Sequence, residues 1–210
     1  MSEQVKTKEK VVMDPKYIIK LTLTLLITCV IVAGLLGLVN QLTAPNIAAI
    51  NKANTEKAMA AVVADPASTF SDPLSITDDM TAAAAQYKTT VSEIYEVQSN
   101  GAAAGYAVKV NASGSQGTIV MMVGVDSEGA VTGVSIVKNA ETSGIGTRVM
   151  NNEALANSGV GVLDQFVGMS HADGDLAVGT NVDAITGATV SSKGVTSGVN
   201  GALAVVEAMG

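Results

Sequence analysis

The hydrophobic pattern changes at about residue 40, and the first element that it predicts is a membrane anchor. Residues 18–39 read IIKLTLTLLITCVIVAGLLGLV, a run of 22 residues with one charged side chain, Lys20. A helix needs about 20 apolar residues to cross the hydrocarbon core of a bilayer. Lys20 lies in the first turn, from which its flexible side chain reaches the lipid headgroups. The pattern therefore predicts one transmembrane helix over residues 18–39.

A cleaved leader is the alternative interpretation of the same run. The apolar core of a signal peptide usually spans about 7–15 residues, and this run is longer. The stretch LITC at residues 26–29 resembles a lipoprotein cleavage site, but Thr28 is bulky for that position and the apolar run continues for ten residues past Cys29. We therefore expect an uncleaved anchor.

The charges on the two sides of this run predict its orientation. Five lysines stand against three acids in the first 20 residues, whereas seven Lys and Arg stand against sixteen Asp and Glu from residue 40 onward. Lysine-rich flanks stay in the cytoplasm by the positive-inside rule. We expect a single-pass protein of the cell membrane, with residues 1–17 in the cytoplasm and the acidic body outside it.

Residues 40–90 are predicted to form a helical linker region. The stretch Ala48–Val63 reads AAINKANTEKAMAAVV, which consists mainly of good helix formers and has no Gly or Pro. Pro66 and Pro73 then interrupt the helical pattern.

From residue 91 the pattern alternates with a period of two, which is typical of strands. Turn signals separate the alternating runs, with SNG at residues 99–101 and DSEG at residues 126–129. Together they predict an antiparallel sheet of about four strands. The predicted strands are Val91–Val97, Tyr106–Val110, Thr118–Val125 and Val131–Val137.

A helical stripe closes the chain, since Val195, Val199, Leu203 and Val206 recur at spacings of four, four and three. Ser191 and Ser192 are predicted to be its N-caps, because serine hydroxyls accept the free N–H groups of a first turn. The predicted fold class is α+β: a single N-terminal transmembrane helix, then an antiparallel-sheet domain over residues 91–210 with flanking helices.

Composition narrows the possible functions. Cys29 is the only cysteine and His171 the only histidine, so the chain forms no internal disulfide and has no set of thiolates or imidazoles for a metal. We expect His171 to be a solvated loop residue. The acidic body is a poor match for nucleic acid, because phosphate binding needs clustered Lys and Arg. We predict neither a metal site nor a nucleic-acid partner.

The segment DAITGATVSS, residues 183–192, leads into the last helix. The start of a helix offers free N–H groups and a partial positive charge, which together attract anions. Gly187 and Ala188 keep side chains out of the way, and Thr189 places a hydroxyl beside the site. A phosphate could be bound there, or esterified to the threonine. Ordinary helix capping is the alternative, and the local physics alone favours it.

Two motifs resemble those of one family. Residues 183–189 (DAITGAT), followed by Ser192, resemble the flavinylation motif D-x-x-[ST]-G-A-T-x-x-[ST]. Residues 141–146 (ETSGIG) resemble the family segment E-T-P-G-[LI]-G, with Ser143 in place of the usual proline. With the single anchor, the chain length and the order of the motifs, nearly the whole chain resembles the G subunit of the Rnf complex.

The resemblance implies a covalent flavin site. In this family a separate flavin transferase joins the phosphate of FMN to the last threonine of the motif, which is Thr189 here. Lys193 is close enough in sequence to help neutralise the phosphate, although an exposed helix lysine usually has no specific role. The resemblance implies that a loop recognised by the transferase is shaped by Asp183, Thr186, Gly187, Ala188 and Ser192, and that the other wall of the site is formed by Glu141, Thr142, Gly144 and Gly146.

The same resemblance implies a role in electron transport. In the family's complex, electrons pass between ferredoxin and NAD, and the energy released moves Na⁺ or H⁺ across the membrane. The chain is then expected to be a redox subunit of a translocase without substrate turnover of its own. Its expected partners are the other subunits of the complex and, during maturation, the flavin transferase.

Two alternatives remain at this point. The C subunit of the sodium-pumping NADH:quinone oxidoreductase shares the motif and the topology, but it is usually longer than 210 residues. The second alternative is a tethered extracytoplasmic module without redox function, in which DAITGAT is a capped turn. Protein that stays colourless when it is made beside a flavin transferase would support this second alternative.

Overall fold

A computed structural model describes residues 14–63 and 65–210, with the backbone alone at Asp173. The predicted cytoplasmic segment, residues 1–17, therefore lies mostly outside the described residues. The chain divides into two compact units, of which one ends at Ala49 and the other is Ile50–Gly210. The boundaries drawn from the sequence after residues 17, 39 and 90 stay predictions.

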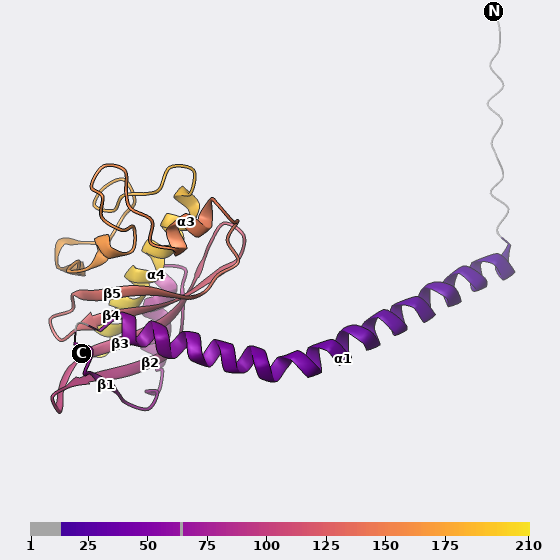
Figure 1. Cartoon of the computed structure of the whole chain (residues 1–210), viewed down its shortest axis with the longest axis horizontal. Coiled ribbons are helices and arrows are strands. Elements are labelled where there is room, and N and C mark those ends of the chain that lie inside the picture. Colours follow the sequence, from indigo (N-terminus) through magenta and orange to yellow (C-terminus); the bar gives the residue numbers. More distant parts are fainter. Residues whose placement is uncertain (1–13, 64) are drawn as a thin grey trace, which may run out of the picture. The chain divides into compact units, whose positions relative to one another are not determined.

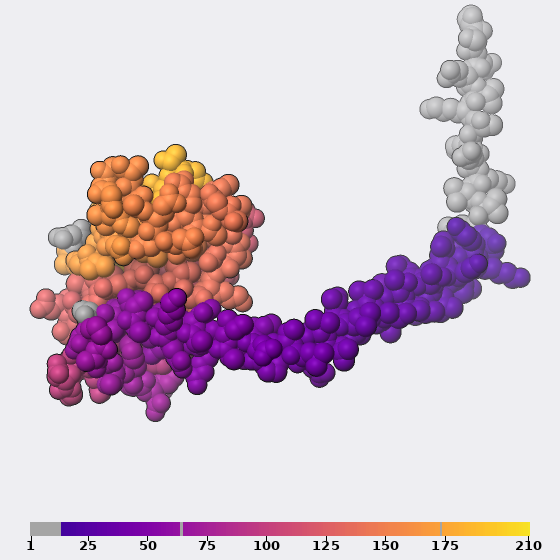
Figure 2. Space-filling view, in the orientation of Figure 1, coloured from indigo at the N-terminus to yellow at the C-terminus, as the bar shows by residue number. Residues whose placement is uncertain are grey.

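Helix α1, Pro15–Ala61, supplies the candidate membrane anchor (Figure 1). Within the described part of the chain it is the one helix that is long and apolar enough to cross a membrane, with a mean hydropathy of 2.5 over its most apolar window. Residues 15–54 of this helix are all exposed, and Figure 2 shows their side chains uncovered along its length. The apolar part of this exposed surface, residues 21–39, suits contact with lipid tails.

Three threonine hydroxyls inside the apolar part of α1 are satisfied within the helix. The hydroxyls of Thr22, Thr24 and Thr28 each donate to the carbonyl four residues earlier, at 2.8–2.9 Å. Bonds of this kind remove the need for water as a partner. The helix continues past Pro45 and includes most of the second predicted helical stretch.

The unit Ile50–Gly210 is built on one antiparallel sheet whose strands follow one another in chain order (Figure 1). The four strands predicted from the period-two pattern are all present, and the fold class is confirmed. The first strand of the sheet was missed because two residues are too few to show a period. The strands are β1 (Thr69–Phe70), β2 (Thr90–Ser99), β3 (Ala102–Ser113), β4 (Thr118–Asp126) and β5 (Val131–Lys138).

Helices cover both faces of this sheet. On one face, α2 (Asp78–Gln86) and α4 (Thr189–Glu207) enclose the main core. On the other face, the last turns of α1 form a smaller core in which Val62 is fully buried. Thr132 of β5 donates its hydroxyl to the Val62 carbonyl at 2.5 Å and so caps the end of that helix.

Short helices and turns connect β5 to α4: α3 (Gly146–Met150), η1 (Asp164–Phe166) and η2 (His171–Asp173). The expectation that His171 is a solvated loop residue is wrong. Its Nε2 lies 3.1 Å from Oδ1 of Asn200, and its Nδ1 lies 3.1 Å from a carboxylate oxygen of Glu207. Its ring centroid is 5.6 Å from that of Tyr87. The histidine therefore fastens the loop to α4.

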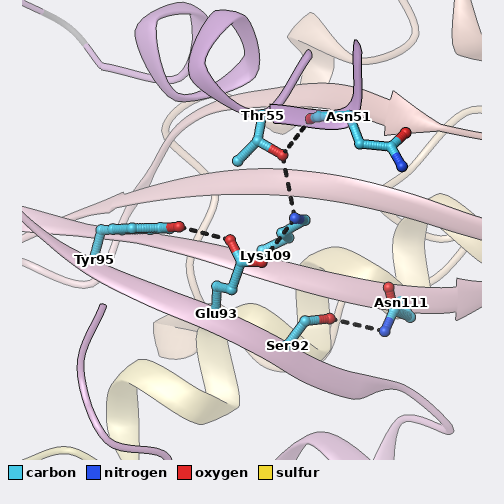
Figure 3. Close-up of polar contacts among 7 residues, drawn as sticks. All are labelled: Asn51, Thr55, Ser92, Glu93, Tyr95, Lys109 and Asn111. Carbon is cyan, nitrogen blue, oxygen red and sulfur yellow. Dashed lines mark hydrogen bonds and ion pairs between the residues drawn. The ribbon is translucent and has the colours of Figure 1, made fainter. Parts of the chain in front are cut away.

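A polar cluster occupies part of the sheet face that α1 covers (Figure 3). The ammonium of Lys109 on β3 lies 2.9 Å from Oε1 of Glu93 and donates to the Thr55 hydroxyl at 3.2 Å. Tyr95 donates its hydroxyl to the other oxygen of Glu93 at 2.6 Å. Burial raises the pKa of Glu93, but the hydrogen bonds from Tyr95 and Lys109 and the lysine charge outweigh it, so the pKa lies below its usual value of 4.5. Burial and the contact with Glu93 raise the pKa of Tyr95 to about 12.

Replacing Lys109 with methionine removes its ion pair with Glu93. The free energy of unfolding is expected to fall by about 1–2 kcal/mol at pH 7, which lies between the values for exposed and for buried ion pairs. The pKa of Glu93 is lower in the folded state than its ordinary value of 4.5. The ionised Glu93 therefore stabilises the fold fully when the pH is above 4.5, and this stabilisation is lost as the pH falls through the pKa of the folded state. The variant should therefore lose less stability on acidification below 4.5 than the wild type. Urea unfolding of the detergent-solubilised chain at several pH values measures both effects, and equal pH dependence in the two proteins would contradict the assignment.

Candidate functional site

The turn before α4 presents Thr189 at the first position of the helix. The N-cap residue is Ala188, with φ −120° and ψ 29°, and it makes no side-chain cap. Gly187 has φ +84°, a conformation that glycine adopts without strain. The side chain of Thr189 is exposed, so its hydroxyl is accessible beside the free N–H groups of the first turn.

The prediction that Ser191 and Ser192 cap this helix is wrong. Both lie inside the first turn, with relative exposures of 1% and 2%. The Ser192 hydroxyl donates back to the Ala188 carbonyl at 3.1 Å. The Ser191 hydroxyl donates to Oε2 of Glu141 at 2.5 Å. Because buried hydroxyls need partners, packing directs these two serines into the protein rather than toward the helix end.

Glu141 joins three segments under the start of α4. Its Oε1 accepts hydrogen bonds from the backbone N–H of Ser115 at 2.7 Å and of Gln116 at 3.4 Å, both in the β3–β4 turn. Its Oε2 accepts the Ser191 hydroxyl. The residue is 8% exposed, and all three of these partners are donors, which suits an ionised carboxylate.

The loop from Glu141 to α3 forms the second wall. The carbonyl of Thr142 accepts the N–H groups of Ile145 at 3.2 Å and Thr147 at 3.3 Å. Gly144 has φ +76° and donates its N–H to the Thr147 hydroxyl at 2.9 Å. A Cβ atom added at Gly146 would overlap the Glu141 side chain and lie 2.9 Å from the Ser191 hydroxyl. The absence of a side chain at Gly146 therefore allows the carboxylate to stay in place.

These segments enclose a cavity of about 180 Å³ beside Thr189. It lies between the first turn of α4, the loop at residues 141–146 and the β3–β4 turn. Ile145 and Val190 give it an apolar rim and are 52% and 57% exposed. The cavity is lined by Ser115, Glu141, Thr142, Ile145, Gly146, Gly187, Ala188, Thr189, Val190 and Ser191.

The first half of the DAITGAT loop is held by side chains that no local pattern marks as part of a site. Gln165 accepts the Asp183 N–H at 2.8 Å and donates to the Asp183 carbonyl at 3.0 Å. Asn157 donates to the Asp183 carboxylate at 2.7 Å. Arg148 donates to the Thr186 carbonyl at 3.3 Å and is itself paired with Glu153 at 2.6 Å. The first half of the loop is thus held at Asp183 and at Thr186.

The structure brings together some of the predicted site residues and separates others. Glu141, Thr142, Gly146 and the GAT triplet at residues 187–189 line the cavity at Thr189. Asp183 and Thr186 line a neighbouring cavity of about 330 Å³. Gly144 shapes the loop, Ser192 is buried in the helix, and Lys193 is exposed on α4. A wider cavity of about 730 Å³ lies beside Lys109 and includes none of the predicted site residues.

The chain is similar to known proteins over most of its length. Residues 114–204 match the FMN-binding domain family, and residues 13–62 match the RnfG N-terminal region. The chain is 34% identical to the G subunit of the Na(+)-translocating ferredoxin:NAD(+) oxidoreductase complex of Acetobacterium woodii, over 96% of this chain and 97% of that protein. It is 30% identical to the G subunit of the ion-translocating oxidoreductase complex of Methanosarcina acetivorans, over 93% and 97% of the two chains.

The chain belongs to the family of G subunits of ion-translocating oxidoreductase (Rnf) complexes. A further relative, the G subunit of the proton-translocating ferredoxin:NAD(+) oxidoreductase complex of Clostridium ljungdahlii, is 30% identical over 52% of this chain and 57% of that protein. The family assignment expected from the two motifs is confirmed. The alternatives, a C subunit of the sodium-pumping NADH:quinone oxidoreductase and a module without redox function, are not favoured.

The residues around Thr189 fit the phosphate end of FMN. An exposed hydroxyl, small side chains at residues 187 and 188, and the free N–H groups of α4 lie at one point. The cavity of about 180 Å³ is smaller than the ~300–1,000 Å³ of pockets that enclose drug-sized ligands. A flavin attached at Thr189 would therefore not fit wholly inside this cavity.

Proposed function

We propose that this membrane-anchored Rnf subunit carries electrons on an FMN that is esterified through its phosphate to Thr189. The observation that carries the proposal is the exposed Thr189 at the start of α4, which lines a cavity whose opposite wall includes residues 141, 142, 145 and 146. The flavin supplies the redox chemistry, and the protein supplies position and electrostatics.

The residues of the chain have separate tasks in this proposal. The first N–H groups of α4 stabilise the negative phosphate, with the helix dipole adding to the effect. Thr189 would provide the oxygen of the ester: in the transferase reaction its O–H bond would break, a new P–O bond to the flavin phosphate would form, and the bond from that phosphorus to the leaving group of the flavin donor would break. Asp183 and Thr186, on the clamped half of the loop, present the segment that the transferase recognises. Gly187 and Ala188 leave room for the phosphate, and residues 141–146 form the other wall.

The place of the subunit in its complex is also part of the proposal. The names of its relatives describe complexes that couple ferredoxin:NAD(+) oxidoreduction to the movement of Na(+) in one organism and of protons in another. We infer that the chain passes electrons between other subunits of such a complex and turns over no substrate by itself. The lysines among the first 20 residues favour a cytoplasmic N-terminus, and with it a flavin domain outside the cytoplasm.

The experiment that tests the proposal is the intact mass of the full chain, made beside a flavin transferase and denatured before measurement. The expected result is a mass increase of FMN minus water that survives denaturation and maps to the peptide containing Thr189. An unmodified mass, with the transferase active on a control protein, would contradict the proposal. The DAITGAT segment would then be interpreted as an ordinary turn before a helix.

A further inference from the structure

The cavity at Thr189 offers an anion little positive charge. Among the described residues that line it, Glu141 is the one with a charged side chain, and the start of α4 adds a partial positive charge of about +0.5. Arg148 is paired with Glu153 at 2.6 Å. Lys193, one turn beyond Thr189 on α4, is exposed to water, which screens its charge. The lining and the helix start together therefore carry a net negative charge.

The charge of Glu141 is fixed in place and poorly screened. The N–H groups of Ser115 and Gln116 and the Ser191 hydroxyl bind its two oxygens. These donors are neutral, so they stabilise the carboxylate without cancelling its charge. At 8% exposure the carboxylate acts on an anion in the cavity at a low effective dielectric. Because the cavity measures only about 180 Å³, a phosphate inside it cannot lie far from Glu141.

The ester bond changes the charge of the phosphate. Free FMN is a phosphate monoester, and such a group carries about −1.5 to −2 at pH 7. Once it is joined to Thr189, the phosphate is a diester with one ionised oxygen and a charge of −1. Repulsion by a fixed carboxylate grows in proportion to the charge of the anion. Glu141 therefore disfavours free FMN more strongly than attached FMN.

We propose that the Glu141 carboxylate excludes free FMN from the Thr189 cavity, so that the flavin is retained through its ester bond. The inference rests on the proposed attachment to Thr189 and adds the residue that sets which form of the phosphate the site accepts. Free FMN bound at the start of α4 would cover the Thr189 hydroxyl and compete with the transferase. Its exclusion keeps the unmodified threonine accessible until the ester is made.

Glu141→Gln separates the charge from the hydrogen bonds. The amide oxygen of glutamine can accept the N–H groups of Ser115 and Gln116 as the carboxylate does. Its NH₂ group can donate to the Ser191 oxygen once that hydroxyl rotates. The variant should thus keep the wall of the cavity while the wall loses its negative charge.

The measurement is a fluorescence titration of the full-length chain, made without a flavin transferase, with free FMN and with riboflavin, which lacks the phosphate. The wild type should bind FMN no more tightly than riboflavin. Glu141→Gln should lower the Kd for FMN about fivefold or more, because the lost repulsion acts at a low effective dielectric, and should leave the Kd for riboflavin unchanged. Asp72→Asn is the matched control, since it makes the same change in net charge at the cavity beside Lys109 and should alter neither Kd.

A second variant keeps the inference testable if Glu141→Gln folds poorly. Thr142 lines the same cavity, and its carbonyl rather than its exposed side chain makes the loop hydrogen bonds. Thr142→Lys adds a positive charge there and should also tighten the binding of FMN but not of riboflavin. A folded variant that gains no affinity for FMN, while the wild type accepts covalent FMN, would overturn the inference alone. A wild-type chain that accepts no covalent FMN from an active transferase would overturn both the inference and the proposed function.

Discussion

Replacing Thr189 with valine is expected to abolish covalent FMN while the fold survives. Valine keeps the branched shape of threonine but has no hydroxyl, so the ester cannot form. The position is exposed at the first residue of α4, where a substitution should change the free energy of unfolding by no more than about 0.5 kcal/mol. The measurement is flavin fluorescence of the denatured protein band after expression with the transferase, with intact mass as the quantitative check.

The matched control for this variant is Thr189→Ser, which removes a methyl group and keeps the hydroxyl. It should retain covalent FMN, although a slower transfer is compatible with the proposal. Full flavin on the valine variant would move the attachment to another hydroxyl, and Thr186 on the same loop is the first position to examine. Loss of flavin together with unfolding, seen by circular dichroism, would contradict the expectation that the position is tolerant.

Gly146→Ala is expected to lower the free energy of unfolding by about 2–4 kcal/mol and to reduce flavin attachment. The added Cβ would overlap the Glu141 side chain, whose carboxylate is held by the β3–β4 turn and by α4. Overpacking of this kind costs about 1–3 kcal/mol. Moving the carboxylate also leaves buried donors without partners, at about 1–3 kcal/mol for each group. Urea unfolding and the fraction of flavinylated protein measure the two effects.

Ser191→Ala provides the comparison, because it removes one donor of the same network without pushing Glu141 aside. Its expected cost is about 1.5–3 kcal/mol, the range for a hydrogen bond to a charged group. If Gly146→Ala lowers the free energy of unfolding no more than Ser191→Ala does, the Glu141 carboxylate has room to move. The close contact at Gly146 would then not constrain the site.

Several elements were predictable because their signals are local. The apolar run at residues 18–39 is long enough to identify an anchor by itself, and α1 contains all of it. Each alternating run from residue 91, and the helical stripe from Val195 to Val206, marks the face of one element that packs against the core. Their positions therefore agree with β2–β5 and α4. The two-residue strand β1 has too little sequence to show a period.

The candidate site was predictable in its motif but not in its surroundings. The DAITGAT segment indicated Thr189 and an adjacent helix start, and the structure places that helix at Thr189. Ser191 and Ser192 look like caps in isolation, yet the close packing of α4 against the rest of the domain buries both hydroxyls. Gln165 and Arg148 brace the loop from 18 and 38 residues away, and no local pattern marks such partners.

Hydrophobic periodicity and short motifs are properties of neighbouring residues, so the amino-acid order was enough to define the anchor, the antiparallel sheet, the terminal helix and the threonine on which the proposed function rests. Packing in three dimensions was needed to bring Glu141, Ser115 and Ser191 together under the start of α4 and to fasten a loop to the same helix through His171. It also left the cavity wall with one negative charge. These contacts join residues 26–50 positions apart. They depend on how the sheet and helices pack, which no local pattern encodes.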